Sequence, residues 1–168
     1  FLADRAERHR ASREPLDDLL GRFHFLVRYR FRQELELEQP AEPLDVYGDP
    51  ADLDRILVNL VGNAVKYTAR GRVRVSSGRA DGRVRLEVAD TGIGIPRDAL
   101  PFLFNEFYRA SNAKAAGESG TGLGLAIVKL LVARYGGEIG VASEEGKGTT
   151  MTVTLPPSPG PPQTPASA

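Results

Sequence analysis

Cysteine is absent from the 168 residues of the chain, which excludes disulfide bonds, thiolate metal centres and cysteine nucleophiles. No apolar run approaches the roughly 20 residues that a membrane-spanning helix needs. A surplus of positive charge is also missing, because 22 basic residues balance 22 acidic ones. This balance disfavours nucleic-acid binding by bulk electrostatics. Lysine is scarce beside arginine, so a lysine within a polar cluster is a candidate functional residue.

The length suits one domain with a full core. Residues 156–168 are rich in proline and are expected to form a disordered tail. Residues 1–15 are charged and predict the end of a helix or a linker, which leaves residues 16–155 as the domain. The chain starts FLADRAERHR, without an initiator methionine or a signal-peptide pattern, so we expect a piece of a longer protein.

Apolar periodicity predicts helices and strands in a mixed order. Helices are expected at residues 16–31, 51–67, 98–104 and 121–135, and strands at 34–38, 44–47, 72–77, 83–89, 138–143 and 149–155. Residues 108–119 are expected to form a mobile loop. In the last helix we expect Leu123, Ile127, Leu130 and Leu131 to face the core. This order predicts an α/β (α+β) two-layer sandwich, with a mixed, largely antiparallel sheet and helices on one face.

The stretch SGTGLGLAIV at residues 119–128 alternates three glycines and leads into an apolar run. A glycine-rich loop at a helix N-terminus is a typical anion site. The dinucleotide fingerprint fails, because it needs glycine or alanine where Leu125 or Ile127 stands. The phosphate loop fails as well, because Gly146-Lys147 is followed by Gly148. The loop alone leaves the anion unidentified.

Asn59, Asn63 and Lys66 are spaced i, i+4 and i+7, so they share one face of the expected helix at 51–67. An ordinary solvated face is one interpretation. A site is the other, because amide oxygens suit Mg²⁺ and a lysine complements phosphates. The helix alone does not decide between them.

Asp90 follows an expected strand, so it should be partly buried and should need a hydrogen-bond donor. An aspartate that bonds its own turn is one explanation. Gly92 and Gly94 would also let a flat ring approach the backbone. The exocyclic amine of adenine would then satisfy the carboxylate, whereas guanine would place an acceptor there.

Two further stretches have ordinary explanations of their own. Phe104 and Phe107 can be core anchors, and Arg109 beside them is either solvated or placed to reach a γ-phosphate. The run Gly146-Lys147-Gly148-Thr149 is compatible with a simple hairpin turn.

Taken together, in order and spacing, these stretches are far more specific. NLVGNAVKYT, DTGIGI, FNEFYRA, GTGLGLAIVK and GKGTTMTVTL resemble the N, G1, F, G2 and G3 boxes of sensor histidine kinase catalytic domains. The resemblance covers residues 16–155. It extends to a superfamily that includes gyrase, heat-shock chaperones of the ninety-kilodalton class and mismatch-repair proteins, and it implies the Bergerat-type ATP-binding fold.

The resemblance implies a site for ATP and Mg²⁺. Asn63 matches the metal ligand, Asp90 matches the acceptor of the adenine amine, and Asn59, Lys66 and Arg109 match catalytic positions near the phosphates. The other nucleotide-binding positions that it implies are Tyr67, Gly92, Ile93, Gly94, Gly120, Thr121, Gly122, Leu123, Gly124 and Thr149.

The resemblance also favours a kinase over a hydrolase. Hydrolysing relatives carry a glutamate four residues before the metal asparagine, and here that position is Asn59, which cannot act as a general base. His9 and His24 lack the surroundings of a phosphoacceptor histidine. The acceptor and its dimerisation helices are therefore expected to be missing here, with residues 1–15 as their end or linker.

The expected partners are that dimerisation domain and a response regulator, within a homodimeric parent. The domain is expected to be cytoplasmic, without nucleic acid or direct membrane contact, although the parent can be membrane-anchored. A serine kinase of the anti-sigma type and a non-catalytic ATP-sensing module are the alternatives of the same fold. Basic and aromatic residues alternate at 28–32, which leaves single-stranded nucleic acid as a third alternative.

Overall fold

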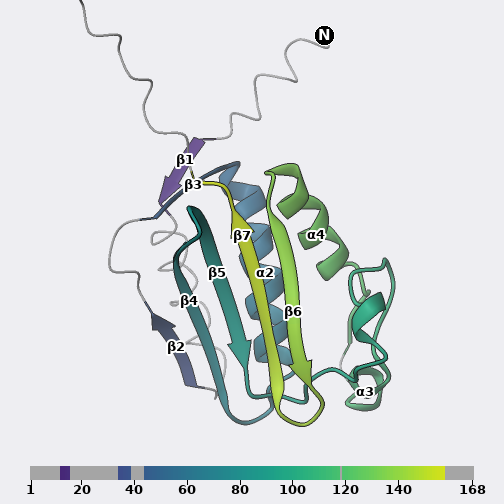
Figure 1. Cartoon of the computed structure of the whole chain (residues 1–168). Coiled ribbons are helices and arrows are strands. Elements are labelled where there is room, and N and C mark those ends of the chain that lie inside the picture. Colours follow the sequence, from purple (N-terminus) through teal and green to yellow (C-terminus); the bar gives the residue numbers. More distant parts are fainter. Residues whose placement is uncertain (1–11, 16–33, 39–43, 118, 158–168) are drawn as a thin grey trace, which may run out of the picture.

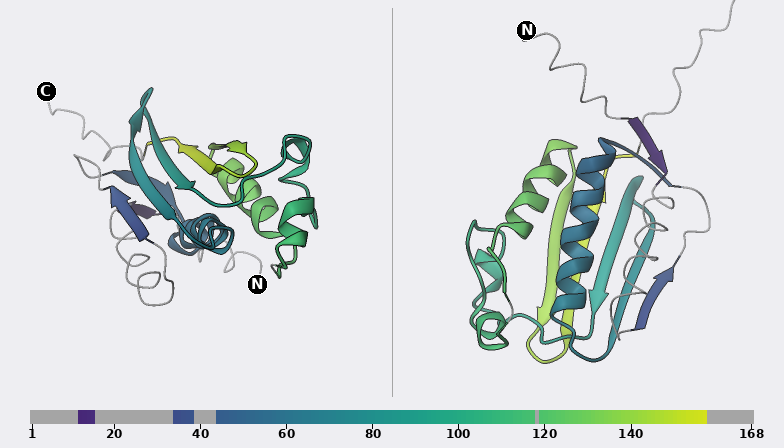
Figure 2. Two further views of the ribbon diagram at one scale, coloured as in Figure 1. Left: turned by 90° about the horizontal axis from the view of Figure 1, so that it is seen from below. Right: turned by 180° about the vertical axis from the view of Figure 1, so that it is seen from behind.

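The computed structural model describes residues 12–15, 34–38, 44–117 and 119–157 (Figure 1). One sheet has the strand order β2-β4-β5-β7-β6, with β2 at Glu34–Glu38, β4 at Arg72–Ala80, β5 at Arg83–Asp90, β7 at Gly148–Leu155 and β6 at Glu138–Glu144. β2 runs parallel to β4, and the other pairs are antiparallel. Helices α2 (Pro50–Lys66) and α4 (Gly124–Arg134) lie on the same face of this sheet (Figure 2). The expected two-layer sandwich is confirmed.

The core lies between the sheet and the two helices. Strand side chains alternate, so that one face is apolar and meets the helices while the other is polar. The buried apolar residues that the five-stranded sheet contributes are Val73, Val75, Val84, Leu86, Val88, Met151, Val153 and Leu155. Each large apolar side chain buried here contributes about 1.5–3 kcal/mol relative to exposure. This packing holds the ends of β5 and β7 rigidly beneath the helices.

Helix α2 forms where its sequence predicts it. The Asp49 carboxylate accepts a hydrogen bond from Ala51 N at 2.8 Å, and Pro50 occupies the first turn, where no amide donor is needed. Its apolar stripe is buried, namely Leu53, Ile56, Leu57, Leu60, Val61 and Ala64. With that stripe turned inward, the polar face that carries Asn59, Asn63 and Lys66 lies to one side of the core.

The turn between β4 and β5 is a tight hairpin. Asp81 and Gly82 have φ of 52° and 73°. Two successive positive φ angles characterise the hairpin turn whose twist matches that of the strands. β4 is longer than the expected strand at 72–77, because Gly78, Arg79 and Ala80 continue the ladder opposite β5.

Helix α4 differs from its prediction in two ways. It begins at Gly124 rather than at residue 121, because Gly122 has a φ of 74°, which no α-helix accommodates. Leu130 was expected to face the core, and this is wrong, since its side chain is 69% exposed. The buried residues are Val128, Leu131 and Val132. The helix is apolar almost all round, so periodicity could not identify its inner face.

Three short segments also differ from expectation. The expected helix at 98–104 is a single 3₁₀ turn, η1 (Leu100–Phe102), and the expected loop at 108–119 contains the short helix α3 (Ser111–Ala115). Residues 12–15 are not helical but form β1 (Ser12–Pro15), which pairs antiparallel with β3 (Asp45–Gly48). The helix expected at 16–31 and the tail from 158 onward lie outside the described residues. Among the helices that the structure describes, none is long and apolar enough to cross a bilayer.

Candidate nucleotide-binding site

A cavity of about 270 Å³ opens at the end of the sheet where β5 ends and β7 begins. Its walls come from α2, the loop after β5, α3 and the start of α4. Most of the residues predicted for the site line it: Asn59, Asn63, Lys66, Tyr67, Asp90, Ile93, Gly94, Arg109, Gly120, Thr121, Gly122, Gly124 and Thr149. Gly92 and Leu123 do not line it. Segments far apart in the sequence therefore meet around one cavity.

Asp90 is a half-buried carboxyl that lines this cavity. It accepts a hydrogen bond from Gly92 N at 2.8 Å. Burial raises the pKa of Asp90, and bonds from the backbone of Gly92 and Thr149 and from the Thr68 hydroxyl offset part of that rise. The Gly92 amide therefore orients the carboxyl, which still lines the cavity, where a ligand donor can reach it.

The glycines after Asp90 have a structural reason that the sequence did not reveal. A Cβ on Gly92 would lie 2.2 Å from the carbonyl oxygen of Tyr67, so Gly92 packs under the end of α2 and not into the cavity. A Cβ on Gly94 would lie 2.0 Å from the carbonyl oxygen of Glu144, and its φ is 65°. The loop must therefore pass close to two backbones whether or not a ring approaches it.

The polar face of α2 forms one side of the cavity. The Asn59 amide donates to Arg55 O at 2.7 Å, and a Cβ on Gly124 would lie 2.5 Å from the Asn59 side-chain oxygen. The Lys66 ammonium donates to the carbonyl of Ser119 and lies 5.1 Å from the centroid of the Tyr67 ring. These contacts connect α2 to the glycine-rich loop, so this face is not simply solvated.

The start of α4 forms the opposite side. No side chain caps this helix, and Leu123 N donates only weakly to the Thr121 hydroxyl at 3.4 Å. Uncapped amides at a helix N-terminus carry partial positive charge and attract anions. Gly122 is required here, because its Cβ would lie 2.7 Å from the carbonyl carbon of Phe107. Arg109, two residues after Phe107, also lines the cavity.

Sequence reasoning missed two polar residues of this region. The Asn112 amide, from α3, donates to Gly94 O at 2.9 Å, and its buried side-chain oxygen has no hydrogen-bond partner in the described part of the chain. Thr68, fully buried, faces the Asp90 carboxyl. Asn112 was hidden in a segment that looked like a loop. Thr68 had a detectable signal, because it closes the stretch NLVGNAVKYT.

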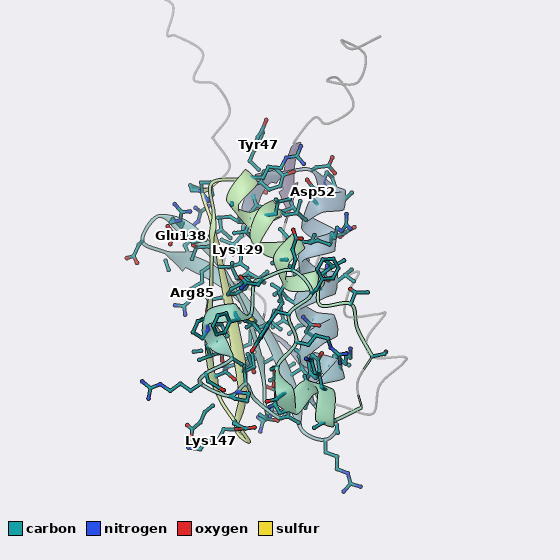
Figure 3. All side chains as sticks on the ribbon, turned by 90° about the vertical axis from the view of Figure 1, so that its right-hand side faces the viewer. Tyr47, Asp52, Arg85, Lys129, Glu138 and Lys147 are labelled. Carbon is teal, nitrogen blue, oxygen red and sulfur yellow. The ribbon has the colours of Figure 1, made fainter. Side chains whose placement is uncertain are left out.

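The far end of the helix pair is held by a separate polar cluster. The Tyr135 hydroxyl donates to the Asp52 carboxylate at 2.7 Å and accepts from Asp49 N at 3.1 Å. Arg134 pairs with the same carboxylate at 3.1 Å. Asp52 lies at the opposite end of the molecule from Lys147, which marks the β6–β7 turn near the cavity (Figure 3). The start of α2 is thereby fixed to the end of α4.

The side chains that line the cavity fit a magnesium ion that is coordinated mostly by a bound molecule and not by the protein. The described residues contain no cluster of three or more histidine, cysteine or acidic side chains. Asn63 supplies a hard amide oxygen to the cavity wall. Mg²⁺ characteristically keeps waters and phosphate oxygens and takes few protein ligands. The site therefore suits a metal that arrives with a phosphate chain.

Comparison with known proteins agrees with this geometry. Residues 48–159 match the family described as histidine kinase-, DNA gyrase B-, and HSP90-like ATPases. The chain is similar to the sensor histidine kinase YkoH of Bacillus subtilis, with 39% identity over 123 residues that cover 73% of this chain and 27% of that protein. It is 45% identical to the signal transduction histidine-protein kinase AfsQ2 of Streptomyces coelicolor over 114 residues, or 68% of this chain and 21% of the relative.

Two solved structures with the same fold are also histidine kinases. The mycobacterial sensor histidine kinase MprB aligns with a TM-score of 0.76 and 31% identity, over 89% of this chain and 99% of that one. Full-length ShkA, solved in complex with AMPPNP, aligns with a TM-score of 0.74 and 35% identity, over 87% of this chain and 31% of that one. The chain thus spans a small part of each full-length relative.

Proposed function

We infer the function from one premise: this chain belongs to the family of histidine kinase-, DNA gyrase B- and HSP90-like ATPases. We propose that it is the ATP-binding catalytic domain of a two-component sensor histidine kinase. One observation carries the proposal: one cavity is lined by a half-buried carboxyl, by a lysine and an arginine, and by an uncapped helix N-terminus.

Asp90 is the residue proposed to accept a hydrogen bond from adenine. An ionised carboxylate accepts hydrogen bonds only, so it suits the exocyclic amine of adenine and opposes the oxygen that guanine carries there. Ile93 and Gly94, which also line the cavity, would lie against the base. Thr149 stands beside Asp90 across the β5–β7 ladder. This end of the cavity selects the base.

The phosphate end is proposed to lie between α2 and the start of α4. Gly122 and Gly124 let the backbone amides approach phosphate oxygens, and Lys66 and Arg109 add positive charge. Asn63 is the proposed protein ligand of Mg²⁺, which supplies charge neutralisation to the phosphates when bound. The support is that these residues line the same cavity and that no side chain caps α4.

The chemistry proposed is phosphoryl transfer and not hydrolysis. Asn59 is an amide that cannot take a proton from water, and its own amide group is bonded to Arg55 O. A histidine ring nitrogen would form a bond to the γ-phosphorus while the bond to the bridging oxygen breaks and ADP leaves. The domain contributes positioning and charge neutralisation.

The rest of the protein is proposed from its relatives. We propose a cytoplasmic domain in a homodimeric kinase whose separate dimerisation domain carries the histidine and whose response regulator receives the phosphoryl group on an aspartate. Residues 16–155 would be the catalytic domain. The relatives named above are all histidine kinases, which does not favour the serine-kinase or ATP-sensing alternatives.

Transfer in trans tests this function. The chain is mixed with radiolabelled ATP, Mg²⁺ and the separately produced dimerisation domain of the same protein. We expect acid-labile phosphate on that domain and none on the chain alone, because His9 and His24 are not acceptors. Asn63→Asp, which keeps a hard oxygen ligand, and Asn63→Ala, which removes it, form a matched pair. Rapid release of inorganic phosphate without any phosphohistidine would contradict the proposal.

A further inference from the structure

We propose that Ser143 is a positioning residue that fixes the direction of the Thr149 hydroxyl, so that Thr149 offers the nucleotide base only a hydrogen-bond acceptor. Ser143 lies on β6 and does not itself line the cavity. The inference rests on the proposed function, because it concerns how the same cavity selects its base.

Three contacts converge on the Ser143 hydroxyl. Ile95 N donates to Ser143 Oγ at 2.9 Å, and Ser143 Oγ donates to the carbonyl of Gly148 at 2.8 Å. The third contact joins Ser143 Oγ and Thr149 Oγ1 at 2.9 Å, where distance alone does not identify the donor.

The proton inventory identifies that donor. A serine hydroxyl has one proton and two acceptor positions. The carbonyl of Gly148 can only accept, so it takes the Ser143 proton. The amide of Ile95 can only donate, so it takes one acceptor position. The remaining position on Ser143 must receive the proton of Thr149, which leaves only lone pairs of Thr149 for the cavity.

Thr149 is placed where this direction matters. It is 9% exposed, lines the cavity and stands directly opposite Asp90 in the β5–β7 ladder. Two acceptors, the Asp90 carboxylate and the Thr149 hydroxyl oxygen, therefore lie at the same end of the cavity. A base with a 6-amino group, or a water that donates, satisfies them. A 6-oxo base brings a third acceptor to the same place.

A merely structural role for Ser143 makes a different prediction. Its hydroxyl also ties the loop after Asp90 to β6 and β7, through Ile95 and Gly148. Loosening that loop would weaken every nucleotide alike. Freeing the Thr149 hydroxyl to rotate would instead let it donate to a 6-oxo group, so only the positioning role changes the preference between bases.

The test compares ADP with inosine diphosphate, whose base replaces the 6-amino group by an oxo group. Dissociation constants are measured calorimetrically for the native sequence, Ser143→Ala, Thr149→Val and the double variant. We expect Ser143→Ala to reduce the preference for ADP by about 3–10-fold, the worth of one hydrogen bond. On the Thr149→Val background, removing the Ser143 hydroxyl should change the preference no further.

Ser77→Ala is the matched control, because Ser77 lies on β4 and its buried oxygen has no hydrogen-bond partner within the described residues. Its preference should equal that of the native sequence. An equal loss of affinity for both nucleotides in Ser143→Ala would overturn the inference and leave the proposed function standing. If that variant does not fold, an unchanged preference in Thr149→Val overturns it. No binding of ADP to the native chain would instead refute the proposed function.

Discussion

The partial burial of Asp90 has two opposite effects, one on the stability of the free domain and one on ligand binding. The sheet and the end of α2 bury it in part, and burial without a counter-ion disfavours the charged form. The same burial makes its hydrogen bond to a ligand donor stronger, because water competes less. An ionised Asp90 therefore gives the domain a lower free energy of unfolding than an uncharged side chain would. This cost falls at the position where base recognition is proposed.

This conflict predicts a specific pH dependence. The pKa of Asp90 is raised above 3.8, so the folded state holds its proton more tightly than the unfolded chain does. As the pH rises above that value, ionisation of Asp90 lowers the free energy of unfolding, until Asp90 is ionised in both states. In urea titrations across this range, the native sequence should lose stability relative to Asp90→Asn. A difference that stays constant with pH would contradict the raised pKa.

Glycine is required at some positions and is incidental at others. In Gly94→Ala the new methyl would lie 2.0 Å from the carbonyl oxygen of Glu144, at a φ of 65°. We expect a loss of more than about 2 kcal/mol in the free energy of unfolding. Gly62→Ala, in α2 with nothing within 4 Å, should gain about 0.5–1 kcal/mol. Chemical denaturation measures both, and similar effects at the two positions would refute the close-packing explanation.

At the scale of elements, the cavity depends on how α2 and α4 are held. Their far ends meet in the cluster of Asp52, Arg134 and Tyr135, while their near ends form the two sides of the cavity. The exposed Arg134 pair contributes little, because water and salt screen it. The Tyr135 hydroxyl, bonded to both a carboxylate and a backbone amide, is the stronger connection.

Tyr135→Phe should therefore destabilise the domain. Removal of the hydroxyl takes an acceptor away from Asp49 N and a donor away from the Asp52 carboxylate, for a cost of about 1–2 kcal/mol. Tyr47→Phe is the control, because Tyr47 is 48% exposed and should change stability by less than about 0.5 kcal/mol. Thermal or urea unfolding measures both variants. Equal stability of the two would show that the cluster does not fix the helices.

The sequence predicted α2 and the sheet well because their hydrophobic patterns allow only one face of each element to be buried. A strand that alternates valine with arginine, as β4 does, can bury only one face, and a capped amphipathic helix such as α2 can turn only one stripe inward. α4 is apolar on most sides, so its inner face depends on its neighbours. α3 was missed because the short run SNAKA has few apolar residues, and its helical turn is docked by Asn112 onto Gly94.

At the scale of the whole molecule, the site was predictable because five separated stretches fit one family pattern. Most of the predicted residues line the cavity, and the two that do not have local reasons. Gly92 packs under α2, and Leu123 precedes the first turn of α4. Ser143 and Asn112 could not be found this way, because a polar residue that acts through a hydrogen bond shows no periodicity. Their contacts exist only in the folded chain.

The proposed function requires this chain to bind an adenine nucleotide through Asp90, with Mg²⁺ at the phosphates. Calorimetric titration with ADP, ATP and GTP, with and without Mg²⁺, tests it most directly on the native sequence and on Asp90→Asn. We predict that ATP binds more tightly with Mg²⁺, that GTP binds at least about 10-fold more weakly, and that Asp90→Asn loses about 10–100-fold in affinity for ADP. Equal affinity for GTP and ATP, or unchanged affinity in Asp90→Asn, would contradict the account.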